Sequence, residues 1–151
     1  GHVHVGGFFT DKPFNPVHFA KCARLARILD FTLGVYSILW DKDDKRRDMY
    51  GKAGTFRPKP YGVEYRTPSN VWIKNKEYRS MVFELLQKAV HIQSSNIGLV
   101  GHLGLNTSED IEKIINEGNA KEAERILRTI IPWHLDFAFE KIVDKCNKEK
   151  S

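Results

Sequence analysis

Two histidines at the start of the chain, His2 and His4, are the first residues whose types and spacing could do chemistry. Side chains two positions apart on a β-strand point to the same face, so the two imidazoles should lie side by side. Converging imidazoles can bind a divalent metal, or one can bind metal while the other contacts phosphate. Paired histidines on a surface strand are common, so this pair alone is weak evidence for a functional site.

A run of basic residues punctuated by glycines follows between positions 46 and 59. Glycine lets the backbone approach an anion closely, and arginine offers a planar fork of donors that matches phosphate oxygens. Such a set could stabilise a phosphoryl group in transfer. A solvated basic loop that binds nucleic acid is the alternative. The basic side chains are Arg46, Arg47, Lys52, Arg57 and Lys59.

Glu64 and Arg66 come next, two positions apart in a stretch whose alternation predicts a strand over residues 63–67, closed by Pro68. The two side chains should therefore share one face of that strand. A carboxylate beside a basic loop can hold Mg²⁺, and a neighbouring arginine can hold a substrate carboxylate. A cross-strand ion pair on an exposed face is the alternative.

The elements that would position these side chains follow from the spacing of apolar, glycine and proline residues. Residues 41–60 are expected to form a loop without regular structure, because the segment is polar and contains Gly51, Gly54, Pro58 and Pro60. The other expected elements are a short strand within 2–9, a helix from Val17 to about Leu39 that relaxes near Gly34, and helices at 76–93, from Ser108, at 120–130 beyond Gly118-Asn119, and from Pro132 to Lys145. This order predicts an α+β fold with too few strands to complete a sheet alone.

The composition fits one globular domain, which we place at residues 1–146 with a frayed tail at 147–151. Hydrophobic residues make up 41% and charged residues 28%, and charges interrupt every apolar stretch before a membrane-spanning length. Cys22 and Cys146 are expected to be reduced and buried, which suits the cytoplasm. The net charge of +5 allows an anionic partner without selecting one.

Two motifs, taken in order, resemble a known group of enzymes. His-Val-His-Val-Gly at residues 2–6 resembles the histidine-bearing strand of the glutamine synthetase and glutamate–cysteine ligase superfamily, and Gly-Val-Glu-Tyr-Arg at 62–66 resembles its Glu-x-Arg strand. The whole segment 46–66 is similar to the phage-type carboxylate–amine ligases, type 2, of tailed bacteriophages. The resemblance is close over residues 1–72.

This resemblance implies a fold and an activity. The fold would be part of a glutamine synthetase-like catalytic domain, an antiparallel sheet with helices packed on one face. The activity would be an ATP-dependent ligase, using Mg²⁺ or Mn²⁺, that joins a carboxylate to an amine through an acyl phosphate. By the same resemblance His2 and Glu64 would bind the metal ion, His4, Lys52 and Arg57 the phosphates, Arg46, Arg47 and Arg57 the transferring phosphoryl group, and Arg66 the substrate carboxylate or acyl phosphate.

Family members carry further metal ligands on strands that precede the histidine strand, so a missing N-terminal half or a neighbouring subunit is expected to complete the site. The expected partners are ATP and an acid and an amine, either small molecules or peptides, in the cytoplasm of a bacterial host; neither a membrane nor nucleic acid is expected. Two other functions stay open. One is a basic nucleic-acid-binding module with Tyr50, Phe56 and Tyr61 as stacking platforms. The other is a catalytically degenerate subunit that keeps the fold without the full site.

Overall fold

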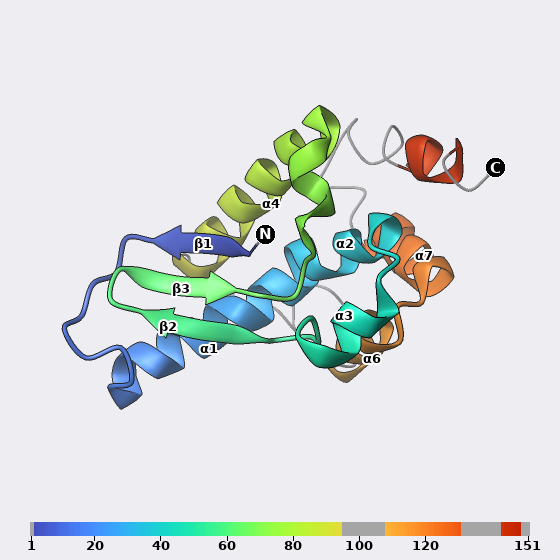
Figure 1. The fold of residues 1–151 in the computed structure, drawn as a ribbon. Coiled ribbons are helices and arrows are strands. Elements are labelled where there is room, and N and C mark those ends of the chain that lie inside the picture. Colours follow the sequence, from blue (N-terminus) through green and yellow to red (C-terminus); the bar gives the residue numbers. More distant parts are fainter. Residues whose placement is uncertain (1, 95–107, 131–142, 149–151) are drawn as a thin grey trace.

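The structure, a computed structural model, describes residues 2–94, 108–130 and 143–148 (Figure 1). Helices and a small sheet alternate along it, which confirms the α+β class. The elements are β1 (Val3–Gly6), α1 (Pro16–Leu29), a π-helical turn (Asp30–Gly34), α2 (Val35–Trp40), α3 (Asp44–Met49), β2 (Phe56–Lys59), β3 (Gly62–Tyr65), a 3-10 helix (Asn70–Lys74), α4 (Lys76–Ser94), α6 (Ser108–Glu117) and α7 (Ala120–Ile130). Residues 143–148 are also helical.

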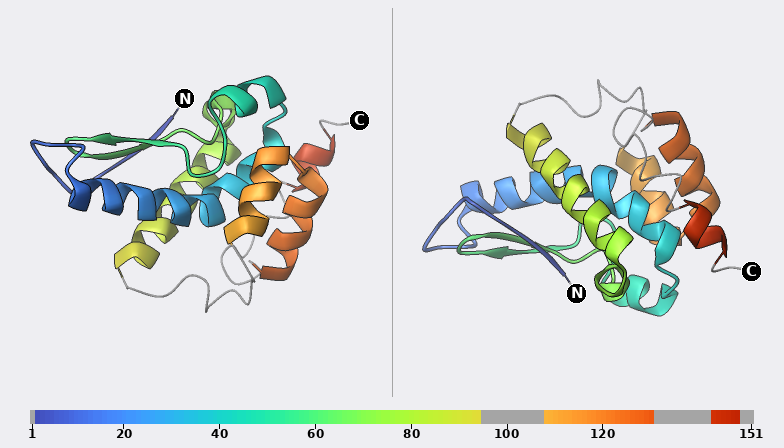
Figure 2. Two further views of the ribbon diagram at one scale, coloured as in Figure 1. Left: turned by 90° about the horizontal axis from the view of Figure 1, so that it is seen from below. Right: turned by 90° about the horizontal axis from the view of Figure 1, so that it is seen from above.

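The strands form one three-stranded antiparallel sheet in the order β1-β3-β2. His4 of β1 and Arg57 of β2 both lie across from Glu64 of the central strand. In the neighbouring row Val3 and Tyr65 are buried in the hydrophobic core. Figure 2 shows α1 against one face of the sheet, with no described helix over the opposite face. The sheet therefore has a core face and an open face, and the row of His4, Glu64 and Arg57 lies on the open face.

The long helix predicted from Val17 is confirmed, together with its relaxation near Gly34. The Asn15 side chain caps the helix by accepting from the backbone N–H of Val17 at 3.0 Å. The helix widens into the π-helical turn at Asp30–Gly34 and then continues as α2. A Cβ at Gly34 would lie 2.7 Å from the hydroxyl of Tyr65, so glycine lets the turn approach the core face of β3.

The prediction that residues 41–60 lack regular structure is wrong, since α3 and β2 both fall in this segment. Helix α3 is short and polar, so it has no apolar periodicity to reveal it. It is instead stabilised by its cap, because the Asp43 carboxylate accepts from the backbone N–H of Arg46 at 2.9 Å. Strand β2 contains Pro58, which cannot donate in a ladder. As β2 lies at an edge of the sheet, that proline is tolerated.

Most of the later elements agree with prediction, although the 3-10 helix at Asn70–Lys74 was not predicted and the last described helix continues to residue 148, into the segment predicted to be a frayed tail. Helices α4, α6 and α7 match the predicted segments, and Gly118 separates the last two in a positive-φ conformation (φ 64°). The predicted helix from Pro132 lies mostly outside the described residues, as does the end of the predicted tail, so the domain bounds stay a prediction. Cys22 and Cys146 are both free thiols and buried, as expected. None of the helices in the described ranges has the length and apolar character needed to cross a membrane.

Gly62 is predicted to be essential for attaching β1. Its φ is 154°, and an added Cβ would lie 2.0 Å from the carbonyl oxygen of Val5, the acceptor side of the β1–β3 ladder. We expect Gly62→Ala to lower the free energy of unfolding by roughly 3 kcal/mol, measured by urea titration.

Gly7→Ala is the matched control. Gly7 also has positive φ (105°), but nothing lies within 4 Å of its added Cβ. This variant should lose only about 1 kcal/mol, from backbone strain alone. Equal losses in the two variants would contradict a steric role for Gly62.

Candidate functional site

Glu64 is the centre of the open face of the sheet. Its side chain is only 5% exposed, and both carboxylate oxygens have partners. Oε1 lies 2.5 Å from Nδ1 of His2 and 3.8 Å from Nε of Arg66, and Oε2 lies 3.2 Å from Nζ of Lys59. A buried carboxylate needs such partners, because an unpaired charge in this position would be strongly destabilising.

The protonation states of this cluster follow from its surroundings. Burial alone would raise the pKa of Glu64, but the hydrogen bond from Lys59, the positive charge of that lysine and the hydrogen bond from His2 hold the pKa of Glu64 below its ordinary value. Burial lowers the pKa of His2. The Glu64 carboxylate raises this pKa and the charge of Arg66 lowers it, and the net shift is downward. At neutral pH Glu64 is therefore ionised and His2 is neutral. Since a carboxylate can only accept, the His2 proton sits on Nδ1 and leaves a lone pair on Nε2.

His4 lies on the same face as Glu64 and contacts the turn between β2 and β3. Its Nδ1 is 2.5 Å from the hydroxyl of Tyr61, within hydrogen-bond distance, and the two rings lie 5.9 Å apart. Both His4 and Arg57, which are aligned on either side of Glu64 in the sheet, are exposed. These two side chains can therefore reach a ligand that lies over the open face.

Arg66 continues the open face beyond the end of β3. Its guanidinium lies 5.9 Å from the centre of the Tyr50 ring, an arrangement that suits a cation–π contact. Nε is buried and makes no hydrogen bond among the described residues, while Glu64 lies 3.8 Å away. Arg66 thus keeps donor capacity beside the only carboxylate of the cluster.

Arg46 and Arg47 lie apart from this cluster and are engaged elsewhere. Arg46 donates to the backbone carbonyls of Arg66, Thr67 and Pro68 at 2.7, 3.0 and 2.8 Å, and its charge lies 3.7 Å from Asp41. The buried guanidinium of Arg47 donates to the carbonyl oxygen of Asp41 at 2.8 Å and pairs with the Asp44 carboxylate. That Arg46 and Arg47 contact a phosphoryl group stays a prediction. In the structure both guanidinium groups hold backbone carbonyls.

Lys52 lies between these two regions. Its side chain is exposed, and its carbonyl oxygen accepts from the hydroxyls of Thr55 and Thr67 at 2.7 and 2.8 Å. The loop that carries Lys52 is therefore tied to the segment that follows β3. Lys52 lies in none of the ion pairs that surround Glu64.

A second polar cluster lies under the sheet, on the core face. Asp30 accepts from the hydroxyl of Tyr65 at 2.6 Å and from the backbone N–H of Gly54 at 2.8 Å. Burial raises the pKa of Asp30 to about 7, although both hydrogen bonds and the charge of Arg27 act in the opposite direction. This carboxyl group joins the π-helical turn, the loop before β2 and the strand that bears Glu64. A π-helical turn is often found beside a functional site.

Sequence reasoning did not assign Lys59, Asp30 or a pairing role for Tyr61. Lys59 could have been found from alternation, since it is two positions from Arg57, but only if β2 had been predicted as a strand. A single aspartate inside the long apolar helix pattern was the available signal for Asp30. Neither signal identifies the partner, because each contact joins segments far apart in sequence.

The donor set restricts how a metal ion could bind. Within the ranges that the structure describes, no three or more His, Cys, Asp and Glu side chains gather as a metal site would require. His2 and Glu64 are two ligands of suitable kind, but they are joined by a hydrogen bond, so a shared ion would have to replace its proton. Mg²⁺ commonly takes one or two carboxylates and completes its shell with water and phosphate, and Glu64 could supply one such carboxylate.

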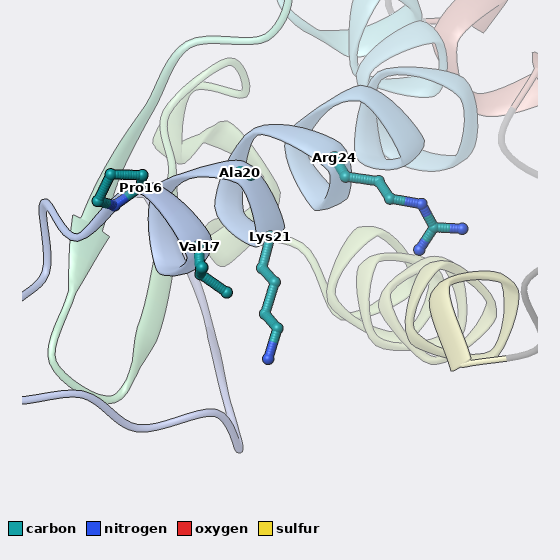
Figure 3. Close-up of a pocket in the computed structure, with 5 residues that line it drawn as sticks. All are labelled: Pro16, Val17, Ala20, Lys21 and Arg24. Carbon is teal, nitrogen blue, oxygen red and sulfur yellow. The ribbon is translucent and has the colours of Figure 1, made fainter.

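A shallow hollow lies along α1 (Figure 3). It measures about 480 Å³ and is lined by Pro16, Val17, Ala20, Lys21 and Arg24. All of these belong to one helix, and none is a predicted site residue. Figure 3 shows Lys21 and Arg24 extending in different directions, so no set of polar groups converges there.

The aromatic residues proposed for nucleic-acid stacking are already in contact with other groups. Phe56 lies 5.2 Å from the Phe19 ring of α1, on the core side of β2. Tyr50 faces Arg66, and Tyr61 faces His4. Phe56 is therefore turned toward the core, whereas Tyr50 is 48% exposed, and the nucleic-acid alternative stays a hypothesis.

Comparison with known proteins gives one match. Residues 1–125 match the family model described as phage phiEco32-like COOH.NH2 ligase-type 2. Neither the curated proteins nor the solved structures include a match to the chain. The matched range contains every residue of the open face and of the cluster around Asp30.

Arg46→Lys is predicted to destabilise the protein by about 2 kcal/mol, because a lysine keeps the charge but cannot donate to carbonyls in several directions at once. Urea titration measures this loss. Arg128→Lys is the control, since Arg128 forms an exposed helix-surface pair with Glu124 and should change by less than about 0.5 kcal/mol. Equal stability of the two variants would contradict a backbone-holding role for Arg46.

Asp30 is predicted to make the protein less stable as the pH rises from about 4 to about 7. Folded Asp30 keeps its proton up to a pKa of about 7, whereas the unfolded chain releases it near the ordinary value of 3.8. The folded state binds more protons in this window, so its free energy of unfolding falls by a few kcal/mol with rising pH. Asp30→Asn should remove this decrease. Parallel pH profiles for the variant and the wild type would show that Asp30 is already ionised in the folded state.

Proposed function

Because this chain belongs to the phage phiEco32-like COOH.NH2 ligase-type 2 family, we propose that the open face of its sheet is part of the active site of an ATP- and Mg²⁺-dependent ligase. The enzyme would phosphorylate a carboxylate and pass the acyl group to an amine. The supporting observation is the buried carboxylate of Glu64, surrounded by His2, Lys59 and Arg66 on a face that no described helix covers.

The charge of this face supports an anionic ligand. This face has one carboxylate, that of Glu64, and three neighbouring cations, which are Arg57, Lys59 and Arg66. His4 adds a polar ring. Arg57, His4 and the exposed Lys52 are proposed to contact the phosphates of ATP. Preorganised donors of this kind stabilise charge that develops in the transition state.

Arg66 is proposed to bind the substrate carboxylate or its acyl phosphate. Its guanidinium offers a planar fork of donors that matches a carboxylate, and the side chain is 17% exposed. His2 and Glu64 would hold Mg²⁺, which when bound would offset the negative charge of the phosphates.

Arg46 and Arg47 are assigned a supporting role in this proposal. By holding the carbonyls of residues 66–68, Arg46 would fix the direction in which the Arg66 side chain leaves the strand. The three strands would form part of a larger glutamine synthetase-like sheet, completed by an N-terminal half or a neighbouring subunit. That completion would also supply the remaining ligands of the metal.

The reaction itself is tested by measuring the release of phosphate from ATP. The assay contains mixed amines and mixed acids, and the acids carry ¹⁸O in the carboxylate. The complete protein is required, with any partner segment or subunit it has. Transfer through an acyl phosphate places one carboxylate oxygen in each released phosphate, so labelled phosphate is the expected result. A protein that binds ATP but releases no phosphate with any mixture would instead be a degenerate subunit.

Arg66→Lys is predicted to raise the KM for the acid roughly tenfold or more and to leave the KM for ATP nearly unchanged, because only the paired hydrogen bonds to the carboxylate are lost. Arg57→Ala should lower kcat roughly 100-fold through loss of a phosphate contact. Arg128→Ala removes the same charge from α7 and serves as the control. A rise in the ATP KM alone in the Arg66 variant would reassign that residue to the nucleotide.

A further inference from the structure

We propose that Tyr61 is a positioning residue that holds His4 in the tautomer with its proton on Nε2, so that His4 meets its ligand as a donor to an anionic oxygen. This inference rests on the proposed function and deepens it, because it names the residue that decides what one imidazole of the pair can bind. The ligand class is a phosphate anion, such as the phosphates of ATP.

The contact between these two side chains engages one nitrogen of the His4 ring. Nδ1 lies 2.5 Å from the Tyr61 hydroxyl, and among the described contacts this is the hydrogen bond that the ring makes. An imidazole lone pair is a stronger acceptor than a phenol oxygen, because imidazole takes up a proton near neutral pH and a phenol does not. The hydroxyl therefore donates to Nδ1, and the proton of the neutral ring is on Nε2.

The turn between β2 and β3 holds Tyr61 in place. The backbone N–H of Thr10 donates to the carbonyl oxygen of Pro60 at 2.8 Å, which ties this turn to the loop after β1. The Tyr61 ring lies beside Gly6, since a Cβ added at Gly6 would lie 4.0 Å from Cδ2 of the tyrosine. Gly6 and His4 are two positions apart on β1, so the ring extends along the open face toward the imidazole. The donor is therefore presented from a fixed turn before any ligand arrives.

The Nε2–H group of His4 has no protein acceptor among the described contacts. Glu64 lies opposite His4 in the ladder, but the partners described above already engage both of its oxygens. His4 is exposed, and so is Arg57 on the other side of Glu64. Two donors thus flank a carboxylate that is already paired, and a ligand that accepts from both carries anionic oxygens. His2 has the opposite tautomer, because its Nδ1 proton is donated to Glu64.

The first test is nitrogen NMR of the His4 ring in the 151-residue chain at about pH 8.5, where free imidazole is neutral. We expect the wild-type ring to carry its proton on Nε2. Tyr61→Phe keeps the aromatic ring but removes the donor, so Nδ1 can compete for the proton. The Nε2 resonance should then move toward that of an unprotonated nitrogen. A wild-type proton on Nδ1, or an Nε2 resonance that Tyr61→Phe leaves unmoved, would overturn the proposal.

The second test is calorimetric titration of the same chain with inorganic triphosphate in the absence of metal. Tyr61→Phe should weaken binding roughly three- to tenfold, because one hydrogen bond to the anion is no longer held in place. In a His4→Ala background the same change should have no further effect. His91→Ala removes an exposed imidazole from α4 and should bind triphosphate like the wild type. Equal binding by Tyr61→Phe and the wild type, no binding by the wild type, or an equal loss in the His4→Ala background would contradict the proposal.

Neither test depends on turnover, so the two proposals can fail separately. A protein that gives these NMR and binding results but releases no phosphate would keep the Tyr61 contact and lose the ligase assignment. Labelled phosphate released by a protein whose His4 carries its proton on Nδ1 would have the opposite meaning.

Discussion

The antiparallel ladder between β1 and β3 is the constraint on which the rest of the structure depends. Its register sets His4 opposite Glu64 and, in the next row, Val3 opposite Tyr65. One row faces the core and its neighbour faces the open side, so a shift of a single residue would exchange the hydrophobic side chains with those of the candidate site. The ladder closes at Gly62, where the carbonyl oxygen of Val5 leaves no room for a side chain. Packing and chemistry are thus determined by the same pairing.

The central strand is held from both sides by polar contacts of opposite character. On the open side the cations around Glu64 hold its pKa below the ordinary value, and on the core side burial raises the pKa of Asp30 to about 7 while this residue accepts from Tyr65. The Arg46 contacts then fix the segment that leaves the strand. A site built on a strand that is fixed in this way can hold its donors in place before a ligand arrives, which is what charge stabilisation in a transition state requires.

The sequence predicted the features that are governed by local rules. The relaxation of the first helix near Gly34, the break at Gly118 and the shared face of Glu64 and Arg66 all follow from spacing and residue type. It failed where a long-range contact decides the outcome. Pro58 argues against a strand unless the strand lies at an edge, and only the folded sheet reveals which strands do. Similarly, the forked donors of Arg46 suit phosphate and carbonyl oxygens equally well, and its position in the fold determines which of these it meets.

The central claim, that Glu64 on the open face marks the active site, is tested most directly by a crystal structure of the complete protein with Mn²⁺ and ATP. Anomalous scattering locates the Mn²⁺ ion without reference to any assumed ligand. We expect an anomalous peak about 2.2 Å from a carboxylate oxygen of Glu64, with the nucleotide phosphates over the open face. A peak at another place, or bound ATP away from the three strands, would contradict the assignment.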